Sequence, residues 1–374
     1  MSRVGKWLAL VVATFALLEI GTLLLVRGGY LNSPPPRYGG TGFWRGHHAE
    51  FGVWHEPNAQ IQHTGKCFNT RYTTNSVGAR DIERDRKSEE PRVVVLGDSF
   101  LEGWGVAASQ RLSNILERET GRAHLNFAMA HFSPYQQLIV YERLASGFEH
   151  DAVIASLAPI NDFLDLDLDN ASRMARYDYK YRPYLIGEPP EFEHFDYLEP
   201  PVRRELRRYS FLFNALLQTV RDIRAEESPE QRSSKFYEFT EREFNIMEAV
   251  LARLARAAAN KRVALVVIPT MQDLEQRSVS GPDPLSKRLA VVTDRLGIQL
   301  VNLLPEMANY RFNPNLDWTG YFFPCDYHWS REGNRAAARI LRQHLGERFY
   351  GVDTGRASSG THGGLDDAEE SRSD

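Results

Sequence analysis

The sequence has little cysteine, no concentration of basic charge and only one long apolar run. Its two cysteines, Cys67 and Cys325, do not belong to C-x-x-C pairs, which argues against the common zinc and dithiol redox motifs. The net charge is -4, and Lys and Arg are spread among Asp and Glu. A nucleic-acid partner is not expected, because phosphate binding requires a basic surface.

The one long apolar run lies at the N-terminus. It extends from 7 to 26, after a short basic leader, and is interrupted mainly by Glu19. About 20 residues are needed to cross a bilayer core, whereas a secretory signal has a shorter apolar region and a small-residue cleavage site. Residues 1–29 are therefore predicted to form an uncleaved signal anchor with the rest of the chain exported. A long signal peptide that is removed is the alternative. Glu19 is either a functional carboxylate or one that is tolerated or paired with another helix.

Hydropathy divides the remaining chain into three parts. Residues 30–91 read as a Pro- and Gly-rich linker followed by a β-rich lead-in, and residues 351–374 as a disordered tail without an apolar period. Between them, short β-branched runs such as 93–96, 152–157 and 263–268 alternate with amphipathic stretches such as 241–260. This predicts an α/β domain over 92–350, a flavodoxin-like three-layer sandwich with a mainly parallel sheet. An insertion at about 165–234 interrupts the alternation and is expected to form a lid or specificity element.

Two short motifs carry candidate chemistry. Ser99 follows the first buried strand in Gly97-Asp98-Ser99, and open α/β sheets bind ligands at the carboxyl ends of their strands. A serine hydroxyl needs a neighbouring base to become nucleophilic. Asp326-Tyr327-His328 precedes the predicted last helix, and a carboxylate beside a histidine can orient the imidazole as that base. Alone, either motif also fits a turn serine or a structural histidine.

Taken in order, these motifs resemble the blocks of the SGNH/GDSL hydrolase superfamily, especially its bacterial membrane-anchored members. The segment 97–100 resembles the first block, with Ser99 as nucleophile and its amide as one oxyanion donor. Asn161 in 159–162 resembles the third block, whose asparagine side chain is a second donor. Asp326 and His328 resemble the fifth block. The resemblance covers most of 74–344 apart from the insertion, and it implies a domain in the periplasm, anchored by a single pass in the inner membrane.

The sequence departs from the family pattern in three places. His131 (or Ala130) stands where the second block has a glycine, although the oxyanion donor there is a backbone N–H that histidine keeps. The third block also lacks its glycine, with Pro159 two positions before Asn161. In the fifth block Asp and His are separated by one residue, not two. The Asp-x-His-Trp form is similar to that of polysaccharide O-acetyltransferases and related acetylesterases, which favours acyl groups on sugars.

Aromatic residues and the two cysteines complete the candidate site. Trp104 and Trp329 flank the motifs and are candidate walls for a substrate, with core packing as the alternative. Tyr177 and Tyr179 belong to an alternating row that is either a sugar-stacking platform or an ordinary half-buried strand. His47, His48, His55 and His63 lack ligand spacing and are interpreted as surface or packing residues. A Cys67–Cys325 bridge would tie the lead-in to the catalytic loop; two unpaired cysteines are the open alternative.

The leading functional hypothesis is an extracytoplasmic serine esterase that removes O-acyl groups, chiefly acetyl, from an envelope glycan or glycolipid. It needs no metal and no cofactor. The alternatives are an O-acyltransferase that uses the same residues on a surface polysaccharide, and a catalytically inactive glycan-binding or assembly protein.

Overall fold

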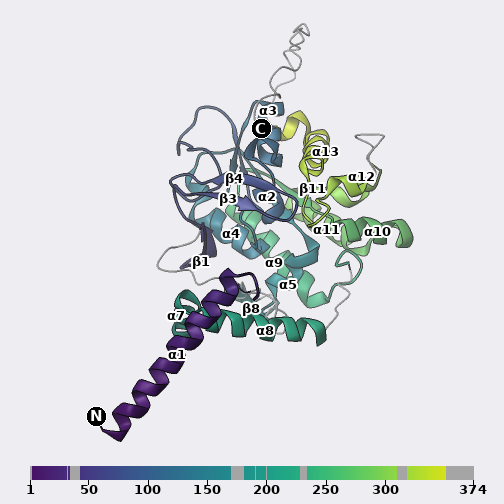
Figure 1. Ribbon diagram of the computed structural model, residues 1–374. Coiled ribbons are helices and arrows are strands. Elements are labelled where there is room, and N and C mark those ends of the chain that lie inside the picture. The colour runs from purple at the N-terminus through teal and green to yellow at the C-terminus, as the bar shows by residue number, and fades with distance from the viewer. Residues whose placement is uncertain are drawn as a thin grey trace.

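The computed structural model describes residues 2–31, 33, 43–169, 181–189, 191–198, 200–227, 234–309 and 318–350. Its centre is a five-stranded sheet, and Figure 1 shows helices around this sheet and one long helix projecting from the globule. The strands are β5 (Arg92–Val95), β6 (Ala123–Asn126), β7 (Ala152–Leu157), β10 (Arg262–Val267) and β11 (Ile298–Asn302).

All neighbouring strands in this sheet are parallel, in the order β11-β10-β7-β5-β6. Counted along the chain this is 2-1-3-4-5, the flavodoxin-like order. β5 and β7 are buried along their whole length, as expected for strands covered on both faces. The predicted fold class is therefore confirmed.

Helices cover the sheet in two layers. On one side α4 (Pro134–Arg143) packs on α9 (Glu241–Ala257), which also contacts α5 (Pro159–Leu166) and α11 (Pro284–Leu296). On the other side α13 (Arg331–Tyr350) packs against α3 (Leu112–Thr120) and α12 (Leu303–Asn309). α9 begins with a capping box, in which Thr240 and Glu243 bond to each other's backbone. This cap stabilises the first turn of the longest amphipathic helix of its layer.

The lead-in forms two small antiparallel ribbons beside the sheet. β1 (Trp44–His48) pairs with β2 (Gly52–His55), and β3 (Gln60–Thr64) pairs with β4 (Asn69–Thr73). The helix α10 (Met271–Ser280) lies after β10, and the short helix α2 (Ser99–Glu102) follows β5. The predicted tail lies outside the described residues.

The insertion contains a β-hairpin followed by two helices. β8 (Pro183–Glu188) pairs with β9 (Glu191–Asp196), and α7 (Pro201–Tyr209) and α8 (Phe211–Glu227) follow. α8 packs against α1 (Arg3–Arg27), the long apolar helix that projects from the globule in Figure 1. Length and composition make α1 long and apolar enough to cross a membrane, a test that a signal sequence also passes.

Candidate active site

The nucleophile candidate lies on a tight turn between β5 and α2. Asp98 caps α2 and accepts a hydrogen bond from the Phe100 amide at 3.0 Å. A Cβ at Gly97 would lie 2.7 Å from Leu101 Cβ and 2.8 Å from Ser156 Oγ, so only glycine fits this turn. The turn places Ser99 at the carboxyl edge of the sheet, where parallel strands present their ligand-binding groups.

The histidine candidate lies on a loop held by backbone bonds. Phe322 and Trp329 form an antiparallel bridge, and the Phe323 amide donates to the His328 carbonyl at 2.9 Å. Cys325, on the same loop, forms a disulfide with Cys67, which lies between β3 and β4. The bridge thus joins the lead-in to the loop that carries Asp326 and His328.

A continuous hydrogen-bonded relay joins the two motifs. Ser99 Oγ lies 2.7 Å from His328 Nε2, and His328 Nδ1 lies 2.5 Å from Asp326 Oδ1. The Trp104 indole N–H donates to the other Asp326 oxygen at 3.2 Å. Although Ser99 and His328 are 229 positions apart, the three side chains of the relay stand in nucleophile–base–orienter geometry.

The electrostatics of the relay favour an ionised Asp326. Partial burial opposes ionisation, but the hydrogen bonds and charge of His328 outweigh it and lower the pKa of the Asp326 carboxyl, and the Trp104 N–H adds to this effect. An ionised carboxylate holds His328 Nδ1 as the protonated nitrogen. Nε2 is then left as the acceptor for the Ser99 proton.

The oxyanion candidates come from strands on either side of β5. His131 follows β6, and Asn161 lies in the first turn of α5, directly after β7. Because β6 and β7 both pair with β5 in parallel, all three carboxyl ends meet at one edge. His131 has φ +69°, the left-handed region that glycine favours. Of the two candidates, His131 and not Ala130 therefore has the backbone conformation that glycine favours.

A buried hydrogen-bonded pair supports the loop that carries His131. Glu102 Oε1 lies 3.1 Å from His55 Nε2, and both side chains are fully buried. The other Glu102 oxygen accepts a hydrogen bond from the Ala130 amide, and His55 Nδ1 faces the Gly78 carbonyl at 3.0 Å. Glu102 therefore connects the nucleophile helix to the residue before His131. His55 is indeed a packing residue, but its role in this pair leaves no signal in the sequence.

A second support comes from the insertion. Arg182, just before β8, donates to the His131 carbonyl at 2.9 Å and to Gln136 Oε1 at 3.2 Å, and it pairs with Asp165 at 3.1 Å. Desolvation and the Arg182 charge lower the pKa of His131 to about 4, so its ring is neutral at neutral pH. The sequence reasoning did not identify Arg182.

Two buried carboxyls, Asp98 and Asp162, interact with each other next to the Ser99 turn. Burial raises the pKa of Asp98 to about 7, and burial together with the Asp98 charge raises the pKa of Asp162 well above its ordinary value. Asp162 accepts a hydrogen bond from the Ala158 amide at 2.7 Å. Like charges so placed do not both ionise easily, so the two carboxyls together retain a proton.

The aromatic candidates divide into core and site. Trp329 is 1% exposed and packs on Phe100, so its assignment as a substrate wall is wrong: the Phe322 bridge turns its ring into the core. Trp104 stacks on His328 and is half-buried. Tyr177 and Tyr179 lie outside the described residues.

The later tyrosines of the alternating row favour packing. Tyr181 and Tyr184 are buried and contact the ring of Tyr197. Among the other histidines, His63 packs edge-on against Trp104. No cluster of metal-ligating side chains occurs in the part of the chain that the structure describes.

Comparison with known sequences gives no match. No family model and no curated protein matches the chain. Similar solved structures include a lipolytic G-D-S-L family member from Veillonella parvula (12% identity, 67% of this chain and 96% of that one, TM-score 0.34). A protein from Slackia heliotrinireducens, described as a proposed SGNH hydrolase, is 12% identical. The match covers 69% of this chain and 100% of that one, with a TM-score of 0.35.

A third solved structure is a proposed acylhydrolase from Bacteroides fragilis with 14% identity. The match covers 71% of this chain and 91% of that one, with a TM-score of 0.33. Likenesses of this size carry no argument by themselves, so fold and site rest on the strand order and side-chain geometry above.

Proposed function

We propose that the chain is a serine hydrolase of the SGNH/GDSL superfamily that cleaves ester bonds through an acyl-enzyme. The observation that carries the proposal is the relay from Ser99 Oγ through His328 to Asp326, at 2.7 and 2.5 Å. A structural histidine does not require both a serine hydroxyl at one nitrogen and an ionised carboxylate at the other. Nucleophilic catalysis does.

The reaction proceeds in two steps. Ser99 Oγ attacks the ester carbonyl and forms the new C–O bond while His328 Nε2 takes its proton. The charged imidazole is stabilised by Asp326 and then gives the proton to the leaving alcohol. Water, activated by His328, attacks the acyl carbon and releases Ser99. The Ser99 and His131 amides and the Asn161 side chain are the proposed oxyanion donors, and losing one such donor costs about 10²–10³ in turnover.

We propose O-acyl groups on an envelope glycan or glycolipid as the substrate and the periplasm as the location. The Asp-x-His-Trp form of the histidine motif favours an acylated sugar. Glu19 of α1 is bonded to the N-terminus of α8, which supports a helix that stays with the folded domain, in contrast to a cleaved signal.

Fluorophosphonate labelling of the full-length protein tests the mechanism. The wild type and Ser109→Ala, a change at an exposed serine, should both label, and Ser99→Ala should not. Labelling that persists in Ser99→Ala would remove the assignment, and an unlabelled but folded wild type would favour an inactive glycan-binding protein.

Acetylated oligosaccharides and aryl esters then test the substrate. Acetate released into water supports the esterase. Transfer of the acyl group to an added oligosaccharide in preference to water would establish the O-acyltransferase instead.

A further inference from the structure

The insertion helices are attached to the apolar helix α1. The Glu19 carboxylate of α1 accepts hydrogen bonds from the Phe211 amide at 2.9 Å, the Leu212 amide at 3.3 Å and the Ser210 hydroxyl. These groups form the N-terminus of α8. A carboxylate inside an apolar span is costly unless it is paired, so this contact fixes α7 and α8 at the level of Glu19 (Figure 1).

The position of Glu19 within α1 gives the depth of this level if α1 crosses a bilayer. Glu19 lies eight positions before Arg27, the last residue of α1, and a rise of 1.5 Å per residue places it about 12 Å inside the end of the helix. Helices that lie in a membrane interface are buried about 5–10 Å into the headgroup and acyl boundary. If α1 crosses the membrane and its end lies at the surface, α7 and α8 begin close to the deeper end of this range.

α7 has the composition of such a helix. It holds four arginines and one glutamate in nine residues. Its apolar side chains Val202, Leu206 and Tyr209 follow the i, i+4, i+7 spacing of one helix face, yet they are 74%, 38% and 53% exposed. A basic helix with an exposed apolar face is typical of binding to an anionic membrane surface.

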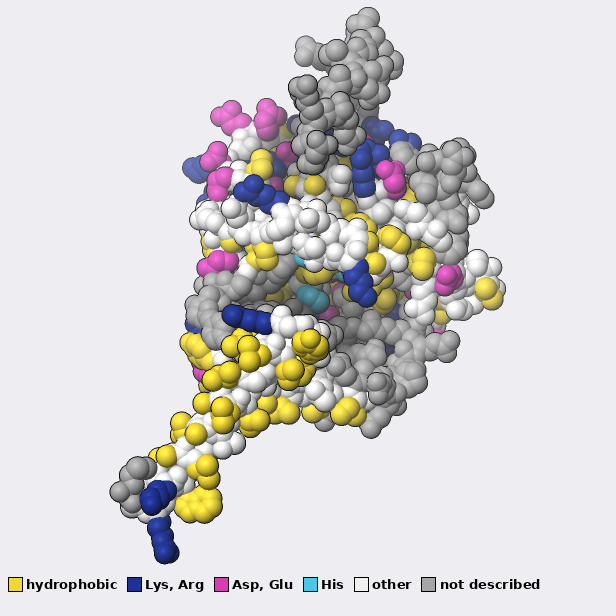
Figure 2. All heavy atoms as spheres, viewed as in Figure 1, with side chains coloured by type: hydrophobic (Ala, Val, Ile, Leu, Met, Phe, Trp, Pro, Cys, Tyr) yellow, Lys and Arg dark blue, Asp and Glu magenta, His cyan; other side chains and the backbone are white. Residues whose placement is uncertain are grey.

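α8 repeats the pattern. Leu216, Val220 and Ile223 have the same spacing and are 57%, 45% and 50% exposed. Figure 2 shows hydrophobic side chains along α1 and along the rim of the globule from which α1 projects. These exposed apolar side chains are therefore continuous with the proposed membrane-crossing surface.

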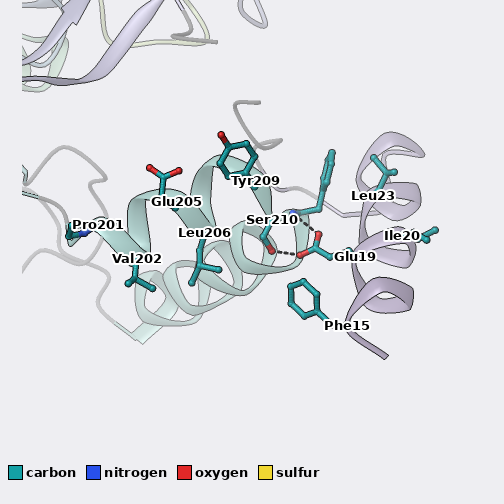
Figure 3. Close-up of a pocket in the computed structure, with 11 residues that line it drawn as sticks. Phe15, Glu19, Ile20, Leu23, Pro201, Val202, Glu205, Leu206, Tyr209 and Ser210 are labelled. Carbon is teal, nitrogen blue, oxygen red and sulfur yellow. Dashed lines mark hydrogen bonds between the residues drawn. The ribbon is translucent and has the colours of Figure 1, made fainter. Parts of the chain in front are cut away.

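An apolar groove separates α1 from α7. Its volume is about 700 Å³, within the range of sites that hold a small molecule. Phe15, Ile20 and Leu23 line it from α1, and Val202 and Leu206 from α7 (Figure 3). At the inferred depth this groove faces the acyl chains of the adjoining leaflet.

We propose that α7 and α8 form a membrane-surface platform that binds anionic phospholipids of the bilayer crossed by α1. Acyl chains contact the exposed apolar side chains and enter the groove, and lipid phosphates bind the arginines of α7, of which Arg204 is exposed. The inference goes beyond the proposed esterase, because lipid binding requires none of the catalytic residues. Arg182 bonds the His131 carbonyl just before the hairpin that leads to α7, so the platform also sets the height of the active site above the lipid.

Quenching of tryptophan fluorescence by lipids brominated on their acyl chains tests the platform. Leu206→Trp and, separately, Val202→Trp are introduced into full-length protein carrying Trp7→Phe, which removes the indole of α1. The control is Val279→Trp, at an 86% exposed position on α10. Each protein is reconstituted into vesicles of phosphatidylcholine and phosphatidylglycerol in about equal parts, with one or the other lipid brominated.

The tryptophans on α7 should be quenched and that on α10 should not, with brominated phosphatidylglycerol more effective than brominated phosphatidylcholine. Arg204→Gln with Arg208→Gln should lower that preference by about fivefold or more, since each basic residue near an anionic surface contributes about that factor. The matched control is Arg256→Gln with Arg331→Gln, at exposed positions on other helices. This control should leave the preference for brominated phosphatidylglycerol unchanged.

Two results overturn the proposal. If neither α7 tryptophan is quenched, the face is covered by something other than lipid, such as a protein partner. If both lipids quench equally in every variant, the arginines do not bind anionic headgroups. Neither readout depends on esterase activity, so failure of the proposed function would be recognised separately by the fluorophosphonate experiment.

Discussion

Trp104→Phe removes one hydrogen bond from the proposed catalytic relay. The indole N–H donates to Asp326 Oδ2 at 3.2 Å, and its ring stacks on His328 at a centroid distance of 5.3 Å. Phenylalanine keeps an aromatic ring at this position and removes the donor. A hydrogen bond to a charged group contributes about 1.5–3 kcal/mol. The bond is long and the Asp326 side chain is 22% exposed, so we expect the lower end, which corresponds to about tenfold in kcat/KM.

A double-mutant cycle with Asp326→Asn shows whether this loss passes through Asp326. The asparagine amide offers one acceptor and one donor group, while Asp326 faces donors on both oxygens: Trp104 on one, and His328 through its Nδ1 and its backbone amide on the other. With Trp104 present, the amide donor of asparagine must face one of these donors. Trp104→Phe should therefore lower the hydrolysis of an aryl ester about tenfold when Asp326 is present and cause no loss in the Asp326→Asn background.

An equal loss in both backgrounds would refute this reasoning. The indole would then act on the substrate, not on Asp326, and the sequence-based assignment of Trp104 as a substrate wall would stand.

Three further changes test other parts of the site. Cys67→Ser with Cys325→Ser opens a bridge across 258 positions and should lower the free energy of unfolding by about 2–5 kcal/mol in denaturant titrations; curves that match the wild type with and without reductant would contradict the bridge. His131→Gly should retain hydrolysis, because glycine keeps the backbone N–H and readily adopts the φ of +69° found there; a loss of about 10²–10³ would show that the imidazole, not the amide, serves the oxyanion. Because burial raises the pKa of Asp98 to about 7 from 3.8, folding takes up a proton there, and the free energy of unfolding should fall as pH rises from about 4 through about 7. Burial also raises the pKa of Asp162, so Asp162 adds to this fall, and Asp162→Asn should reduce the fall between about pH 5 and pH 8; an unchanged slope would show that Asp162 does not take up a proton on folding.

Local patterns in the sequence determined the fold class and the identity of the relay. The strand predicted at 152–157 has those bounds, and the one predicted at 263–268 is observed one residue earlier, because β-branched runs between amphipathic helices fit few structures other than a parallel sheet. Ser99 and His328 stood out because a strand-end turn and a helix-preceding Asp-x-His are short motifs whose chemistry depends on adjacent residues.

Only the tertiary structure determined what supports those residues. His55 and Glu102 are 47 positions apart, Arg182 and His131 are 51 apart, and Glu19 and Phe211 are 192 apart. A polar contact between distant residues has no period and no spacing along the chain, so it appears only when folding excludes water around both partners. The same reason explains why the burial of Trp329 and the partner of Glu19 could not be predicted. A sequence shows that a side chain is aromatic or charged, but its burial and pairing depend on which distant segments pack around it.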